Sequence, residues 1–408
     1  MILRKEYLNK LWKLKDLEII KVITGIRRCG KSTLLKQFET QLLLDGVDKD
    51  QIVSINFEEL ENEKFLDYNV LYDHLKSKII KNKTTYFFLD EIQMVNSFEK
   101  VINSLFVKEN TDIYITGSNA YLLSSELATL LSGRYIEINL LPFSFKEYIE
   151  LMTAPDNDKL FSDYLINGGL PYASLIRKNN IGSDLGYIEG IYNTVFIKDI
   201  QEREKRREIN PLERKITDIQ LLKDISKYLS SVIGNPVSMN SIANYLTSSG
   251  RKTSHVTVGQ YVQALEESYL FYKCERMDVK GKKLLKLNYK YYMVDLGFRR
   301  HILAQQKYDI GFSLENIVYF ELLRRGYQVN IGKVDNQEVD FVAFKDGVYE
   351  YIQVSATVLD ETTFNREITP LQNINDNYPK FILTSDKLGL GNYDGIEVVN
   401  IIDWLLFN

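Results

Sequence analysis

One segment constrains the fold of this 408-residue chain more than any other: residues 25–32 read Gly-Ile-Arg-Arg-Cys-Gly-Lys-Ser. They match the pattern G-x-x-x-x-G-K-[ST], in which backbone N–H groups surround phosphate oxygens at the start of a helix. A β-branched run at 18–24 precedes the segment and a helical pattern at 33–38 follows it, so the order is strand, loop, helix. We therefore predict a parallel α/β sheet with a nucleotide-phosphate site at this loop.

The residue types in the loop fit particular roles toward a nucleotide. We expect the Lys31 ammonium to neutralise the β- and γ-phosphates of ATP and the Ser32 hydroxyl to bind Mg²⁺. The expected phosphate contacts come from Gly25, Ile26, Arg27, Arg28, Cys29, Gly30, Lys31, Ser32 and Thr33. Arginines are unusual at 27 and 28, and phosphate, DNA or a neighbouring acid are their candidate partners. The alternative is a glycine-rich turn that binds no ligand.

The composition narrows the class of protein. Hydrophobic residues make up 45% and charged residues 26% of the chain, as in soluble globular proteins. A formal net charge of −4 excludes a protein that coats nucleic acid through overall charge, so DNA contacts would have to come from local patches. Cys29 and Cys274 suit a reducing compartment, and no apolar run reaches the roughly 20 residues needed to cross a bilayer. We therefore expect a cytoplasmic protein without membrane contact.

A second motif follows an apolar run at 84–89, which is typical of a central strand in a parallel sheet. The run ends in two adjacent acids, Asp90 and Glu91. Because neighbouring side chains in a strand point in opposite directions, Asp90 can reach Mg²⁺ while Glu91 faces a water next to the γ-phosphate. We predict Asp90 as a metal ligand and Glu91 as the general base. The alternative is an ordinary strand end followed by a helix N-cap.

The order of strands extends the argument. Residues 51–58 predict a strand between the two motifs, and this strand with the glutamate after Asp90 resembles the additional-strand, catalytic-glutamate division of P-loop ATPases, which includes the AAA+ group. Five segments resemble a large prokaryotic family of AAA ATPases: 24–28 (Thr-Gly-Ile-Arg-Arg), 89–93 (Leu-Asp-Glu-Ile-Gln), 117–119 (Gly-Ser-Asn), 131–134 (Leu-Ser-Gly-Arg) and 141–145 (Leu-Pro-Phe-Ser-Phe). Members carry a C-terminal domain of unknown function (DUF4143-like) with a nuclease-like fold, and the resemblance covers essentially the whole chain.

The resemblance implies further site residues. AAA+ proteins place a sensor of the γ-phosphate at the end of the strand predicted at 111–119, which implies Ser118 or Asn119 here. They send an arginine into the neighbouring subunit's site from the region after the next helix, which implies Arg134. Asn56 stands where many AAA+ proteins carry a polar residue that restrains the catalytic glutamate. The alternatives are a strand-terminating turn at Asn119 and a surface arginine that closes a helix at Arg134.

The middle of the chain predicts helices and a hairpin. From 217 to 292 the pattern is helix, turn, helix, turn, helix and two strands, which is the order of a winged helix. A Gly-Gly-Leu-Pro segment at 168–171 predicts a turn in a helical lid. The expected fold is α/β, with a AAA+ P-loop ATPase core (parallel sheet, helices on both faces) at 1–150, a helical lid and linker at 151–215, a winged helix at 216–300 and a restriction-endonuclease-like α/β domain at 301–408.

Basic residues gather in the predicted winged helix. Those expected to meet DNA phosphates lie before its third helix and around the hairpin tip: Arg251, Lys252, Lys280, Lys282, Lys283 and Lys286. Lys290, which alternates with tyrosines on the second strand, belongs to the same patch. The alternative is a set of edge-strand lysines that prevents aggregation, on a winged helix that binds protein.

The C-terminal region resembles the PD-(D/E)xK nuclease fold, in which an Asp on the second strand and an acid-x-Lys on the third bind Mg²⁺ and activate water. Asp340 matches the first position, and Glu315 stands on a helix that often supplies another acid. The third strand carries Gln353 and Ser355 in place of the acid and the lysine. Because the lysine that stabilises developing charge is missing, we expect a degenerate domain that binds or oligomerises and does not cleave.

Together these features predict an AAA+ ATPase that hydrolyses ATP with Mg²⁺ as cofactor, forms a homo-oligomer and acts on or with DNA. Three other classes stay open: a DNA-binding regulatory switch with little turnover, an ATP-gated nuclease, and a protein-remodelling ATPase with a protein partner and no DNA. The intact pair Asp90 and Glu91 argues against the switch. Gln353 and Ser355 argue against the nuclease.

Overall fold

The structure is a computed structural model that describes residues 2–117, 131, 133–194, 200, 216, 218–304 and 310–407. The chain divides into two compact units. The first comprises Met1–Pro142 with the short segments Ile197–Ile209 and Glu267–Tyr269, and the second comprises Phe143–Phe196, Asn210–Glu266 and Leu270–Asn408. Within the described ranges, no helix is long and apolar enough to span a membrane.

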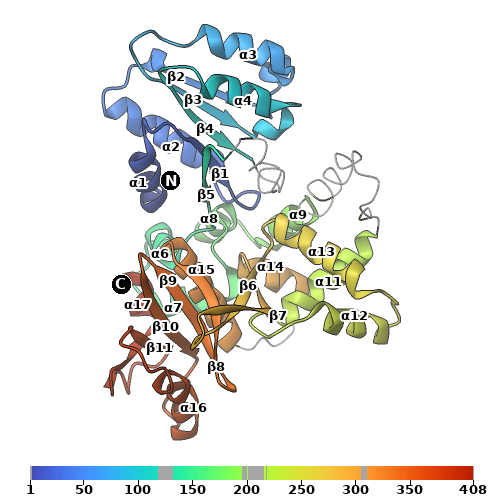
Figure 1. Cartoon of the computed structure of the whole chain (residues 1–408), viewed down its shortest axis with the longest axis vertical. Helices are drawn as coiled ribbons and strands as arrows, with labels where there is room; N and C mark the ends of the chain where they lie inside the picture. Colours follow the sequence, from blue (N-terminus) through green and yellow to red (C-terminus); the bar gives the residue numbers. More distant parts are fainter. Residues whose placement is uncertain are drawn as a thin grey trace. The chain divides into compact units, whose positions relative to one another are not determined.

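The first unit is an α/β sandwich. Its helices are α1 (Lys5–Leu14), α2 (Lys31–Leu44), α3 (Tyr68–Ser77) and α4 (Phe98–Phe106), with short 3-10 helices η1 (Lys49–Gln51), η2 (Leu60–Leu66) and η3 (Ile92–Met94). Its strands are β1 (Ile20–Thr24), β2 (Ile52–Asn56), β3 (Thr85–Asp90), β4 (Thr111–Thr116) and β5 (Tyr135–Asn139). All five strands are parallel, in the order β2-β3-β4-β1-β5 (Figure 1). Strand β4 therefore lies between β1, which leads into the phosphate loop, and β3, which ends in the acids, while β2, the strand predicted between the two motifs in sequence, lies at the edge of the sheet.

The alternation of side chains along these strands builds a core on each face of the sheet. Phe87 and Leu89 point to one face, where they join a buried cluster with the apolar stripes of α3 and α4. Phe88 points to the other face, where its ring lies against Tyr114 and the α2 residue Phe38. Both faces are thus covered by helices, as the predicted fold requires.

A buried ion pair lies within the α1–α2 face of the sheet. The Lys21 ammonium donates to an Asp112 carboxylate oxygen at 2.6 Å, and both side chains are almost fully excluded from solvent (0% and 1%). Asp112 also accepts from the backbone N–H of Asp16 and from the hydroxyl of Tyr114. Burial raises the pKa of Asp112 and outweighs the effect of the lysine.

Removing one charge of this pair should destabilise the first unit strongly. In Asp112→Asn the Lys21 ammonium stays buried without a counter-charge, which costs about 3–5 kcal/mol. Urea unfolding followed by Trp12 fluorescence, in a chain with Trp404→Phe, measures the loss. Asp48→Asn is the matched control because it breaks the exposed pair with Lys83, and we expect little change there. Equal losses in both variants would contradict this assignment.

The second unit contains many helices and one large sheet. Its described helices are α6 (Phe145–Met152), α7 (Asn157–Asn167), α8 (Pro171–Lys178), α9 (Leu185–Thr194), α11 (Ile219–Ser231), α12 (Met239–Ser248), α13 (His255–Glu267), α14 (Leu296–Leu303), α15 (Ile310–Arg324), α16 (Glu361–Gln372) and α17 (Ile401–Phe407). Its strands are β6 (Phe271–Asp278), β7 (Lys283–Met293), β8 (Gln328–Val334), β9 (Gln337–Lys345), β10 (Val348–Ser355), β11 (Lys380–Thr384), β12 (Gly391–Tyr393) and β13 (Ile396–Asn400). The sheet order is β12-β13-β11-β10-β9-β8-β6-β7.

The hairpin β6–β7 differs from the predicted wing. Helices α11, α12 and α13 and the hairpin follow in the expected order, but β6 pairs in parallel with β8. The hairpin is therefore part of the C-terminal sheet, and the expected boundary at residue 300 runs between strands of one sheet. The prediction of a separate wing was wrong because the pairing of β6 with β8 joins residues more than 50 positions apart and leaves no local pattern.

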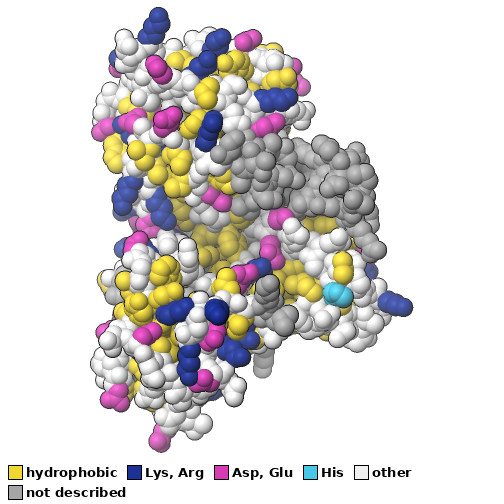
Figure 2. Space-filling model, viewed as in Figure 1, with side chains coloured by type: hydrophobic (Ala, Val, Ile, Leu, Met, Phe, Trp, Pro, Cys, Tyr) yellow, Lys and Arg dark blue, Asp and Glu magenta, His cyan; other side chains and the backbone are white. Residues whose placement is uncertain are grey.

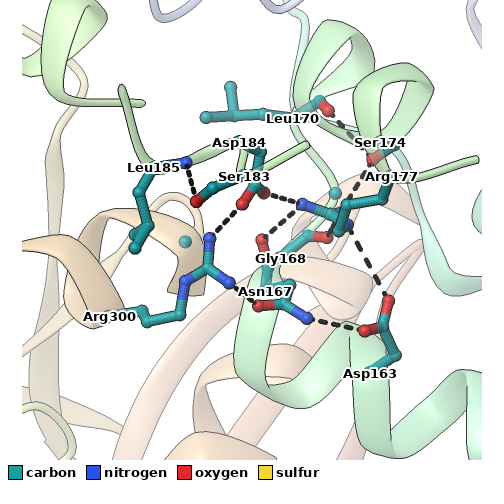
Figure 3. Close-up of polar contacts among 12 residues, drawn as sticks. Asp163, Asn167, Gly168, Leu170, Ser174, Arg177, Ser183, Asp184, Leu185 and Arg300 are labelled. Carbon is teal, nitrogen blue, oxygen red and sulfur yellow. Dashed lines mark hydrogen bonds and ion pairs between the residues drawn. The ribbon is translucent and has the colours of Figure 1, made fainter. Parts of the chain in front are cut away.

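The Gly-Gly-Leu-Pro segment forms a turn between α7 and α8 that fits around Asp295. Gly168 has φ 68°, and a Cβ there would lie 2.0 Å from an Asp295 carboxylate oxygen. The Gly169 N–H donates to the same carboxylate, and Pro171 begins α8. Figure 3 shows the adjoining network, in which Arg177 and Arg300 both bind Asp184. These contacts tie α7, α8 and α14 together.

Candidate functional site

The phosphate loop joins β1 to α2 and has the backbone shape that the sequence predicts. Gly25, Arg28 and Gly30 have φ values of 136°, 67° and 104°, all in the left-handed region. A Cβ at Gly25 would lie 2.3 Å from the carbonyl oxygen of Leu140, so only glycine fits there. The Lys31 Nζ donates to the carbonyl oxygens of Gly25 (3.0 Å) and Ile26 (3.3 Å), which holds the ammonium over the loop. The N-terminus of α2, starting at Lys31, is thus open to an anion.

The two predicted metal ligands lie together at the end of β3. The Ser32 hydroxyl hydrogen-bonds to the Asp90 carboxylate, and the Thr116 hydroxyl, from the end of β4, donates to the same carboxylate. Burial raises the pKa of Asp90 more than these hydrogen bonds lower it. In the described part of the chain, no three His, Cys, Asp or Glu side chains converge as a metal site. One carboxylate and one hydroxyl fit Mg²⁺, which takes its other ligands from phosphates and water.

Glu91 follows directly, in a left-handed backbone conformation with φ 56°. Its N–H donates to the Thr116 hydroxyl oxygen at 3.0 Å, so one threonine contacts both acids. The Glu91 carboxylate accepts a hydrogen bond from Nε2 of Gln93 at 2.5 Å. Asn56 lies beside Asp90 in the sheet register, but its amide oxygen accepts from the Glu58 N–H. A left-handed backbone at a residue other than glycine, as at Glu91, is often found at functional sites.

Sequence reasoning missed four residues that support this site. Thr116 carries a weak signal, since it is a polar residue at the end of the strand next to β3, and Gln93 stands inside the quoted Leu-Asp-Glu-Ile-Gln segment. For Arg4 and Tyr7, no local sequence pattern indicates a contact with the site. The Arg4 guanidinium donates to the carbonyl oxygens of Cys29 (3.3 Å) and Leu141 (2.7 Å), and the Tyr7 hydroxyl accepts from the Leu141 N–H. The start of the chain therefore supports the phosphate loop.

Of the other predicted catalytic residues, the structure describes Arg134, which does not join the site of its own chain. Asn119 and Ser118 lie outside the described residues. Arg134 precedes β5, whose first residue pairs with the first residue of β1, so it lies at the amino ends of the strands and the loop lies at their carboxyl ends. Its guanidinium packs over the Phe106 ring at 5.5 Å. Arg27 lies 3.9 Å from the Glu58 carboxylate.

The predicted DNA-binding patch is partly neutralised by acids of the same unit. Arg251 pairs with Asp218 at 2.8 Å and with Asp224 at 3.2 Å. Lys280 pairs with Asp335 at 2.7 Å. On the face shown in Figure 2, Lys and Arg side chains are interspersed with Asp and Glu. Phosphate would have to compete with these acids, and DNA contact by Arg251 and Lys280 stays a prediction.

Lys282 is held by aromatic rings. Its Nζ lies 3.5 Å from the centre of the Tyr349 ring and donates to the Tyr351 hydroxyl at 3.1 Å. The Tyr378 ring is 5.1 Å away. Cation–π contacts of this kind hold the hairpin tip against β10, so a phosphate would have to compete with these rings for Lys282. Lys252 and Lys283 remain exposed, and the side chain of Lys286 lies outside the part of the chain that the structure describes.

Lys290, counted with the same patch, is instead buried in an acidic centre. Its Nζ lies 2.8 Å from Glu315, 2.9 Å from Glu338 and 3.7 Å from Asp340. The Tyr292 hydroxyl also donates to Glu315. Burial raises the pKa of Glu315 and, more strongly, that of Asp340. The surface assignment of Lys290 was wrong because both faces of β7 are covered at this point.

This centre contains the three residues predicted for a degenerate nuclease site. Gln353 accepts from the Asp340 N–H at 2.7 Å and donates to Glu367 at 3.0 Å, and Glu315 lies on the Lys290 ammonium. The third strand lacks a lysine, as the sequence shows, but β7 supplies one from outside the predicted domain. The folded centre therefore contains a lysine, Lys290, although the third strand does not.

The chain resembles known proteins along most of its length. Residues 18–149 match a family model described as AAA domain, and residues 158–309 match a domain of unknown function (DUF8612). An uncharacterized protein of Haemophilus influenzae (strain Rd) is 39% identical over 411 residues, which cover 100% of this chain and 99% of that protein. An uncharacterized protein of Methanocaldococcus jannaschii is 32% identical over 383 residues, which cover 87% and 79%.

Solved structures with a similar fold include the Walker-type ATPase paby2304 of Pyrococcus abyssi and AMPPCP-bound DnaA from Aquifex aeolicus. The first has a TM-score of 0.49 at 16% identity and covers 74% of this chain and 96% of that chain. The second has a TM-score of 0.31 at 15% identity, with 65% and 90% covered.

The phosphate loop and the acids at the end of β3 both lie in the part of the chain that matches the AAA domain. Over its whole length, the chain belongs to the family of the Haemophilus influenzae and Methanocaldococcus jannaschii proteins. The DUF4143-like, nuclease-like ending stays a prediction, since the matched domain of unknown function ends at residue 309.

Proposed function

We propose that the chain binds ATP with Mg²⁺ and hydrolyses it at the loop–β3 site. One observation carries this proposal: beside the phosphate loop, Ser32 hydrogen-bonds to Asp90, and the Thr116 hydroxyl contacts both Asp90 and Glu91. Phosphate release from ATP by the purified chain, with Mg²⁺ and with excess EDTA, tests it. No Mg²⁺-dependent release under any tested assembly state would overturn it.

Each residue of the site has a distinct task in this proposal. The loop N–H groups and the Lys31 ammonium bind the phosphate oxygens, while Ser32 and Asp90 are placed to hold the metal. Bound Mg²⁺ would neutralise charge on the β- and γ-phosphates. Glu91 accepts the proton of the attacking water. The proposal keeps the nucleotide contacts that the sequence predicts for the loop, from Gly25 to Thr33.

We also propose that a second copy of the chain completes the site through Arg134. The amino ends of β1 and β5, where Arg134 lies, are opposite to the edge that carries the phosphate loop. From the amino ends of the strands, the Arg134 guanidinium can only serve a nucleotide that is bound to another copy of the chain. This proposal makes the working form a homo-oligomer, with Arg134 stabilising charge on the γ-phosphoryl group.

DNA is the proposed partner of the second unit, through the exposed lysines Lys252 and Lys283, and the cytoplasm is the proposed location. We assign no cleavage to the acidic centre, because the Lys290 ammonium occupies the space between Glu315 and Asp340 that a divalent cation would need. A protein partner at the same helices is the alternative to DNA.

If these lysines contact DNA phosphates, Lys252→Glu with Lys283→Glu should weaken binding to all duplex sequences alike. Each lost contact should reduce the slope of log K against log[salt] by roughly 0.9. Fluorescence anisotropy with duplexes at several salt concentrations measures both quantities. Lys280→Glu with Lys282→Glu is the matched control, since the Asp335 and tyrosine contacts already hold these lysines. Equal affinities and slopes in wild type and Lys252/Lys283 variant would favour a protein partner.

A further inference from the structure

In the turn after β3, the proposed general base Glu91 has a side-chain hydrogen bond to Gln93. Glu91 precedes η3, and its carboxylate accepts from the side-chain amide of Gln93 two residues later. Both side chains are buried, with 8% and 6% of each residue exposed. A buried hydrogen bond from an amide to a carboxylate fixes the carboxylate's rotation more firmly than contact with solvent would.

The bond is set by the local chain and does not depend on a distant element. The left-handed backbone of Glu91 turns the chain, and the 3-10 turn that follows brings residue i+2 back beside residue i. The Thr116 hydroxyl holds the Glu91 N–H from the neighbouring strand. Backbone and side chain of Glu91 are therefore restrained from two directions in the chain without nucleotide.

We propose that Gln93 is a positioning residue that orients the Glu91 carboxylate toward the attacking water, an inference that rests on the proposed ATPase function. The Gln93 amide donates to one oxygen of this carboxylate and so limits the rotation of the group that would accept the water's proton. In that step the water oxygen bonds to the γ-phosphorus, the bond from phosphorus to the bridging oxygen breaks, and its electron pair leaves with ADP. The proton passes from the water to Glu91.

This role differs from the restraint that Asn56 would provide. A restraining residue on another strand can release the glutamate when a ligand arrives, whereas the turn from Glu91 to Gln93 keeps the two groups adjacent. Removing the amide should therefore lower turnover and not raise the basal rate. A shift of about 1 Å in a catalytic group can cost on the order of 100-fold in rate.

Gln93→Met removes the hydrogen-bond donor and keeps the length of the side chain. We expect kcat to fall about 10- to 100-fold while KM for ATP changes less than about threefold, because ground-state phosphate contacts remain. This split between kcat and KM distinguishes a positioning role from a general loss of structure, which would affect both quantities.

Gln93→Glu is the matched second variant. It has nearly the same shape but an ionised carboxylate cannot donate, so its kcat should fall at least as far as that of Gln93→Met while KM again changes little. Wild-type kcat in Gln93→Met would overturn the proposal. So would a loss confined to KM. If the wild type itself shows no Mg²⁺-dependent turnover, the proposed ATPase function fails; turnover that stops in Glu91→Gln but persists in Gln93→Met defeats only this inference.

Discussion

Lys31→Ala is expected to lose ATP binding, whereas Glu91→Gln is expected to bind ATP and stop turning over. The Lys31 ammonium lies on two loop carbonyls and faces the ground-state phosphates, so its loss should weaken ATP affinity at least about 10- to 100-fold. Glu91 acts only on the water, so its loss should lower kcat by roughly 10²–10⁴ with little change in affinity. Titration with a fluorescent ATP analogue and a phosphate-release assay separate the two effects.

Lys36→Ala is the control for the first variant, because Lys36 lies on the exposed side of the same helix and should behave as wild type. Retained ATP affinity in Lys31→Ala would remove the loop from the proposed site. Wild-type turnover in Glu91→Gln would instead leave the loop assignment intact and transfer the role of base to another residue.

Mixing Arg134→Ala chains with Glu91→Gln chains should restore part of the activity that each lacks alone. If Arg134 serves a neighbour, one interface in the mixed assembly combines an intact Glu91 with an intact Arg134. Arginines of this kind are worth roughly 10³ or more in rate, so even a minority of restored interfaces should be visible in phosphate release. The position of Arg134 at the strand edge opposite its own loop motivates the experiment.

Co-assembly must be shown in the same mixture, for example by pull-down of two differently tagged chains. Phosphate release by Glu91→Gln chains alone gives the baseline rate. Full activity of Arg134→Ala alone would exclude a catalytic role for Arg134 and leave only its packing over the Phe106 ring. No recovery in a mixture that co-assembles would count against action between copies.

The sequence predicted the phosphate loop and the two acids because each is a contiguous segment with its own strand or helix. The glycine conformations, the Lys31 contacts and the pairing of Ser32 with Asp90 all follow from those segments. Thr116 could not be assigned in the same way, because its contact with both acids requires β4 to lie beside β3. Arg4 reaches the loop across 25 residues of sequence, and nothing in its local pattern indicates that contact.

The second unit was harder to predict because its decisive contacts are remote in sequence. The spacing of apolar residues predicts helices α11 to α13, but it does not predict the pairing of β6 with β8. Lys290 looked like a surface charge because it stands among lysines and tyrosines. Its burial depends on acids from α15 and β9, which approach only when the sheet forms.

The shared sheet has a consequence for how this architecture can be inherited. Strands from residues 271–293 and from 328 onward form one hydrogen-bonded sheet, so a gene fragment that begins after residue 300 would encode β8 with β9 but without β6. A central strand that loses one neighbour becomes an edge strand, and its exposed backbone donors and acceptors favour aggregation. Recombination at that point would therefore yield two incomplete proteins, and the segment from the hairpin to the C-terminal strands should be gained, lost or exchanged as one piece.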